Sequence, residues 1–142
     1  MLTPAPKGYK PFYISHYGRH GSRWLLHDSE YDEVMAVFRA ADAANAFTER
    51  GREVYGRVKR VYDDGIDRGG DLSPLGAEQH REIAARMYRN FPEVFRSGAV
   101  VDAQATLVVR CVLSMAAFCE RLKELNPRLE VSRTAGRRTT RY

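Results

Sequence analysis

The chain has 142 residues, of which 44% are hydrophobic and 29% charged, and a formal net charge of +5. This length and composition predict one ordinary globular domain. They exclude a membrane-spanning helix, because no apolar run approaches the ~20 residues that a span requires. The first residues also lack the apolar core of a signal peptide.

The positive charge gathers at the end of the sequence. Residues 128–142 contain five arginines and one acid, so the rest of the chain is nearly neutral. No lysine stripe interleaved with aromatic residues is present, and we therefore do not expect nucleic acid as a partner. A basic nucleic-acid-binding module that depends on this tail alone is kept as an alternative.

The first part of the sequence predicts one strand and two helices. Apolar and polar residues alternate over 12–16, which is typical of a strand, and a turn follows at Gly18 and Gly21. Asp28 or Ser29 is expected to cap a helix that runs to about Phe47. Thr48 is expected to cap a second helix that ends at residues 63–65.

The second part predicts alternating helices and strands. A third helix starts at Ser73-Pro74 and stops at residues 90–92. Residues 99–105 read as a strand, 106–125 as a helix, and 129–132 as the possible start of another strand. This order indicates an α/β domain with a largely parallel sheet, which two or three strands would leave incomplete.

The two cysteines predict neither a disulfide nor a metal site. Cys111 and Cys119 are eight residues apart in one expected helix, which is ~12 Å of helical rise and beyond disulfide reach. No CxxC or paired-histidine spacing accompanies them. We expect both to be packing thiols.

The segment Tyr17-Gly18-Arg19-His20-Gly21-Ser22-Arg23 indicates phosphate chemistry. It places one imidazole between two guanidinium groups, which bind phosphate bidentately and should lower the histidine pKa. A neutral His20 ring could then attack phosphorus as a nucleophile. No metal or other cofactor is needed for this chemistry. The alternative is a polar surface loop without a function.

The other three histidines are assigned no role. His16 is expected to be a packed, hydrogen-bonded side chain, and His27 and His80 are expected to be surface residues beside helices.

The motif Arg19-His20-Gly21-Ser22-Arg23 resembles the Arg-His-Gly-x-Arg signature of the histidine phosphatase superfamily, in its histidine acid phosphatase branch. Further segments are similar to the bacterial multiple inositol polyphosphate phosphatases. They are residues 14–17, 69–76, 79–80, 86–88, 91–95, 110–115 and 117–118. The resemblance extends from about Pro6 to Glu130.

This resemblance implies a fold, an activity and a site. The fold would be a three-layer sandwich like that of phosphoglycerate mutase, here with an incomplete sheet. The activity would be hydrolysis of phosphomonoesters, with inositol polyphosphates such as phytate as small-molecule substrates. His20 would be the phosphorylated nucleophile, assisted by Arg19, and Arg23 and Arg110 would bind the phosphate. No cofactor is implied, and the parent protein would be periplasmic or secreted.

The sequence also departs from the family pattern. No histidine follows His80, so the distal His-Asp or His-Ala-Glu motif that supplies the proton donor is absent, and neither Asp71 nor Asp102 matches a donor position. We expect residues 1–132 to be the N-terminal part of the α/β domain. Residues 133–142 would be an aberrant basic tail of the kind that a truncation or a frame shift produces. The alternative function is a non-catalytic phosphate-binding remnant.

Overall fold

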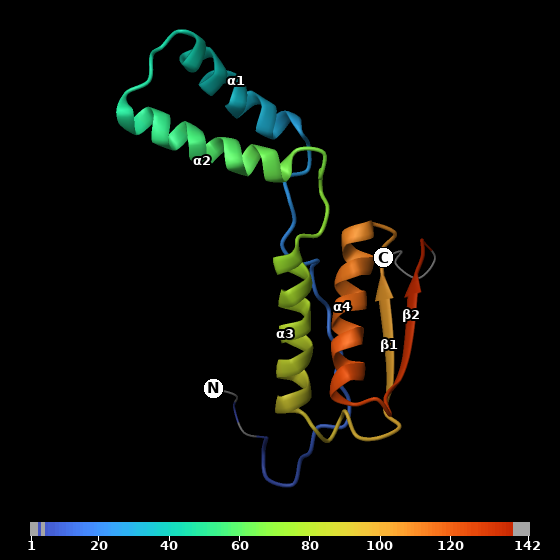
Figure 1. The fold of residues 1–142 in the computed structure, drawn as a ribbon. Helices are drawn as coiled ribbons and strands as arrows, with labels where there is room; N and C mark the ends of the chain where they lie inside the picture. Colours follow the sequence, from blue (N-terminus) through green and yellow to red (C-terminus); the bar gives the residue numbers. More distant parts are fainter. Residues whose placement is uncertain (1–2, 4, 138–142) are drawn as a thin grey trace. The chain divides into compact units, whose positions relative to one another are not determined.

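The computed structural model describes residue 3 and residues 5–137 of the chain. Within this part the fold is mixed α/β, with the helices α1 (Ser29–Ala43), α2 (Glu49–Gly65), α3 (Pro74–Asn90) and α4 (Val109–Leu125), and the strands β1 (Val100–Ala105) and β2 (Glu130–Ala135) (Figure 1). None of the described helices is both long and apolar enough to cross a membrane. The chain forms two compact units. Unit 2 consists of Arg23–Asp71, and unit 1 of the residues before and after it.

Unit 1 is built around α4, which packs on α3 and on both strands (Figure 1). Its core consists of Ala84, Phe95, Leu122 and Leu129, contributed by α3, α4 and the loops beside the strands. Leu122 is completely buried. Ser73 caps α3 as expected, because its hydroxyl accepts a hydrogen bond from the Gly76 N–H at 3.1 Å.

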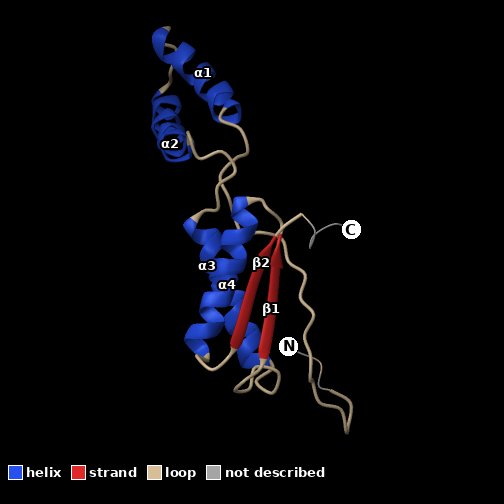
Figure 2. Cartoon of the chain, turned by 90° about the vertical axis from the view of Figure 1, so that its right-hand side faces the viewer, coloured by secondary structure: helices blue, strands red, loops and turns tan. Residues whose placement is uncertain are grey.

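The two strands are parallel, as predicted, and pair in register from Val100 with Glu130 to Ala105 with Ala135 (Figure 2). Val131 packs against the core, whereas the alternate side chains of β1, at Val100 and Asp102, are exposed. Strand β2 continues through Ala135, so residues 133–135 of the expected basic tail pair with β1. Arg138, Arg141 and the rest of 138–142 lie outside the described residues.

The predicted strand over residues 12–16 is wrong. Residues 9–22 form neither helix nor strand (Figure 2), and the described sheet contains only β1 and β2. Alternation predicts which side chains can be buried together, but a strand also needs a neighbour for its backbone hydrogen bonds. Here Ile14 packs against the core and the His16 ring stacks on Phe118 at 5.8 Å, while Phe12 remains 91% exposed.

Unit 2 is a helical hairpin of α1 and α2. Helix α1 ends at Ala43 and not near Phe47, because Asn45 adopts a left-handed φ of 48° and the N–H of Ala46 turns back to Ala41. Thr48 caps α2 as predicted, its hydroxyl accepting from the Gly51 N–H at 3.0 Å. The rings of Phe38, Phe47 and Tyr55 stack beside this connection, with centroids 5.2 to 6.2 Å apart.

Candidate functional site

Hydrogen bonds to α3 and α4 hold the loop Arg19–Ser22 in unit 1. The Gly21 N–H donates to the Ser114 hydroxyl of α4 at 3.1 Å, in a buried position. The Ser22 N–H donates to Oε1 of Gln79 on α3 at 2.9 Å. Because buried backbone groups are costly to leave without partners, these two side chains fix the path of the loop.

Two more side chains of unit 1 bind the carbonyl groups of the same loop. The Nε2–H of His80 donates to the Arg19 carbonyl at 3.1 Å, and the Ser73 hydroxyl donates to the Ser22 carbonyl at 2.9 Å. Burial lowers the pKa of His80 below its ordinary value, which favours the neutral ring. The loop is thus bound through both its N–H and its C=O groups.

The loop and the first turn of α3 also touch backbone to backbone. A Cβ atom at Gly21 would lie 2.6 Å from the Cα of Gly76, and one at Gly76 would lie 2.8 Å from the Ser22 nitrogen. Distances under 3.0 Å leave no room for a side chain, so both positions require glycine. The glycine of the Arg-His-Gly motif is therefore explained by this close approach.

His20 is half-buried, and one of its ring nitrogens is already engaged. Its Nδ1 lies 2.7 Å from the carbonyl oxygen of Gly21. A carbonyl only accepts hydrogen bonds, so Nδ1 carries the proton and donates. The neutral ring then has its lone pair on Nε2, which is the atom that could act as a nucleophile.

Two of the three predicted arginines lie in the same unit as His20. Arg19 precedes it directly and is exposed. Arg110 is half-buried in the first turn of α4, four residues before Ser114, and residues at this spacing share one face of a helix. The bond from Gly21 to Ser114 therefore brings the loop to the face of α4 that carries Arg110.

The third predicted arginine, Arg23, begins unit 2. Its guanidinium donates to the carbonyl of Trp24 at 2.7 Å. The Trp24 ring in turn faces the guanidinium of Arg68, 4.7 Å from the ring centroid.

Hydrogen bonding and burial set the ionisation of one carboxyl group and one thiol in unit 1. Asp102 accepts hydrogen bonds from Ser132 and Gln104, which hold its pKa below the ordinary value and favour the carboxylate. Cys111 and Cys119 are free thiols, and burial raises the pKa of Cys119. Within residues 3 and 5–137, no three His, Cys, Asp or Glu side chains are grouped to hold a metal ion.

Sequence reasoning missed the side chains that hold the loop. His80 was predicted to be a surface residue, which is wrong, because it is only 7% exposed and packs under the loop. A signal was present: Gly76, Gln79 and His80 have i, i+3, i+4 spacing and so share one face of α3. A glycine on that face indicates the close approach of another backbone.

The chain matches no family model and no curated protein sequence. Its function is therefore argued from the site and from the resemblance of the motif.

Proposed function

We propose that the chain carries the nucleophile and the phosphate-binding arginines of a phosphomonoester hydrolase of the histidine acid phosphatase type. Inositol polyphosphates such as phytate are the proposed substrates, and the three-layer sandwich is the proposed parent fold. The observation that carries the proposal is the His20 ring, whose Nδ1–H is held by the Gly21 carbonyl so that Nε2 keeps its lone pair.

The proposed reaction has two steps. In the first, Nε2 of His20 attacks phosphorus, the bond from phosphorus to the ester oxygen breaks, and the alcohol leaves after taking a proton from an acid or from water. The ring becomes cationic as the N–P bond forms, and the bond from Nδ1–H to the Gly21 carbonyl then becomes charge-assisted. In the second, water attacks phosphorus, the N–P bond breaks, and phosphate is released.

Fixed positive charge supports the same proposal. Arg19 adjoins the nucleophile, and Arg110 lies on the face of α4 to which the loop is bound. Guanidinium groups bind phosphate oxygens bidentately and stabilise the charge that develops on them. Arg23 is assigned the same role by the motif. A highly anionic substrate suits such a site.

One observation favours the second candidate, a phosphate-binding remnant without catalysis. The hydrogen bonds to Asp102 favour its ionised form, so this carboxyl group is unsuited to protonate a leaving alcohol. Lack of a positioned general acid typically lowers a rate by ~10²–10⁴. Both candidates use the arginines to bind phosphate, and they differ in whether a phosphoryl group is transferred to His20.

The test compares two substrates with different leaving groups. p-Nitrophenolate leaves without protonation, whereas an inositol alkoxide does not, so p-nitrophenyl phosphate reports the nucleophile independently of a donor. We expect slow phosphate release from it, slower release from phytate, and none from either with His20→Ala. His27→Ala is the matched control, because His27 is exposed and has no assigned role.

The outcomes separate the candidates. Release that persists in His20→Ala would remove His20 from the mechanism. Phytate binding that is lost in Arg110→Ala but retained in Arg96→Ala, with no release and no phosphohistidine, would establish the remnant. Arg96 is an exposed arginine outside the helices and strands and serves as the charge control. If the chain neither binds phytate nor releases phosphate, both proposals are refuted.

A further inference from the structure

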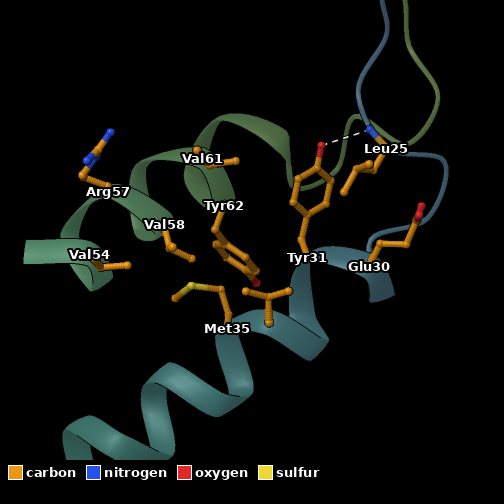
Figure 3. A pocket seen from close by; sticks show the side chains of 10 residues that line it. Leu25, Glu30, Tyr31, Met35, Val54, Arg57, Val58, Val61 and Tyr62 are labelled. Atoms are coloured by element: carbon orange, nitrogen blue, oxygen red, sulfur yellow. Dashed lines mark hydrogen bonds between the residues drawn. The ribbon is translucent and has the colours of Figure 1, made fainter. Parts of the chain in front are cut away.

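An apolar cavity of about 390 Å³ lies between α1 and α2 within unit 2. Figure 3 shows aliphatic and aromatic side chains from both helices turned toward it, among them Tyr31, Met35, Val54, Val58, Val61 and Tyr62. The cavity is open to solvent, since Val61 is 62% exposed and Val34 48%. These apolar side chains are exposed together within one helical hairpin, which makes the groove a candidate interaction site.

Two charged side chains line this groove, and they lie toward opposite ends of it (Figure 3). The ring of Tyr31 packs against Gly65, so the start of α1, with Glu30, is level with the end of α2. Arg57 lies eight residues before Gly65 on α2, which corresponds to ~12 Å along the helix axis. The apolar side chains fill the interval between the two charges.

Neither charge is neutralised within the hairpin. One carboxylate oxygen of Glu30 accepts a hydrogen bond from the His27 N–H at 3.0 Å, and no cation is bound to it among the described residues. Arg57 makes no hydrogen bond or ion pair with another described residue. Both groups are therefore available to a partner.

We propose that this groove is the interface between two copies of the chain, in which Glu30 of each copy pairs with Arg57 of the other. A surface with an anion at one end and a cation at the other is self-complementary under a two-fold rotation about its centre. The same rotation places the two sets of apolar side chains against each other. Two hairpins packed in this way form a four-helix arrangement.

The charge pattern favours a second copy over other occupants. A fatty acid or another anionic amphiphile would pair with Arg57 and leave Glu30 without a cation. An unrelated helix would need an acid and a base at the same ~12 Å separation on either side of an apolar face. A second copy has this pattern by symmetry. The proposal is independent of the phosphatase proposal, because no residue that lines the groove has a role in phosphate chemistry.

The experiment measures the mass of the full chain by sedimentation and light scattering over about a hundredfold range of concentration. We expect a monomer–dimer equilibrium. In a dimer of Glu30→Arg, the substituted side chain of each copy would face Arg57 of the other copy. In a dimer of Arg57→Glu, it would face Glu30. Each substitution therefore creates two repulsive pairs and should weaken the dimer by about tenfold or more. A mixture of the two variants restores both attractive pairs and should form a heterodimer of wild-type affinity.

A pair of valine variants tests the apolar part of the interface. Val61→Glu places two carboxylates at the centre of the groove and should reduce dimerisation by more than about a hundredfold. Val37→Glu is the matched control and should leave it unchanged, because Val37 is 69% exposed on α1 and does not line the groove. Both side chains are largely exposed, so folding of the monomer should be retained, as checked by circular dichroism.

Three results would overturn the proposal. The first is a monomer at every concentration, which would assign the groove to a different occupant. The second is a dimer that Val61→Glu leaves intact, which would place the interface elsewhere. The third is a mixture of Glu30→Arg and Arg57→Glu that associates no better than either variant alone, because only direct pairing between copies predicts the rescue.

Discussion

Replacing Gly21 by alanine tests whether the Arg19–Ser22 loop rests directly on α3. The new Cβ atom would lie 2.6 Å from both the Cα and the carbonyl carbon of Gly76. Both are backbone atoms of a helix, so no side-chain rotation relieves the contact and the loop has to move. Overpacking of this kind costs ~1–3 kcal/mol, and more where the backbone must shift.

The movement has a second cost. The Gly21 N–H is buried and bonded to the Ser114 hydroxyl at 3.1 Å, and displacement of the loop breaks this bond. A buried donor that loses its acceptor costs a further ~1–3 kcal/mol. We therefore expect Gly21→Ala to lower the free energy of unfolding by about 2–6 kcal/mol, which is a large part of the stability of a small domain.

Urea unfolding followed by circular dichroism measures the effect, and Gly56→Ala provides the control. Gly56 lies inside α2, and a Cβ atom there meets nothing within 4 Å. Alanine should stabilise that helix by about 1 kcal/mol, the opposite sign to the effect at Gly21. A Gly21→Ala variant within about 0.5 kcal/mol of the wild type would refute the close contact between loop and helix.

Further substitutions test the rest of the fold. Burial holds the pKa of His80 below its ordinary value of 6.5. Below this pH the imidazole is protonated in the unfolded chain but stays neutral in the folded chain, so the free energy of unfolding should decrease as the pH falls. His80→Gln should reduce this dependence in urea titrations at several pH values, and an unchanged profile would exclude His80 as its source. Leu122→Ala should lower the unfolding free energy by ~2–5 kcal/mol, because the side chain is completely buried; a change under about 1 kcal/mol would contradict its place in the core. Thr48→Ala should cost about 1 kcal/mol through loss of the α2 cap, and Thr48→Ser should restore most of it.

The helices could be predicted from the sequence because their ends carry local signals. Thr48 and Ser73-Pro74 have the side chains that satisfy the first N–H groups of a helix, and both helices begin where these residues predict. The end of α1 was missed by four residues. A left-handed Asn45 stops the helix, and asparagine gives a weaker stop signal than glycine.

Errors arose where the outcome depends on residues distant in the sequence. Residues 12–16 alternate like a strand, but whether they form one depends on a neighbouring strand that local pattern does not reveal. His80 looks like a polar residue on a helix flank. Its burial results from the loop that crosses over it, 61 residues earlier in the chain.

The candidate site shows the same division between local and distant information. The motif itself identifies Arg19 and His20, because their chemistry is readable from residue types. The carbonyl of Gly21 selects the tautomer of His20 that carries its proton on Nδ1. The position of Gly21 in turn depends on Gly76 and Ser114.

Ser114 connects this loop to the arginine of α4. It lies one helical turn after Arg110 and binds the residue that follows His20. Removal of its hydroxyl therefore removes the hydrogen bond between the loop and the face of α4 that carries Arg110, while every charged side chain of the site is retained. If phosphate is bound by the loop and by Arg110 together, Ser114→Ala must weaken phosphate binding although it removes no charge. If Arg110 acts alone, the same substitution must leave binding unchanged.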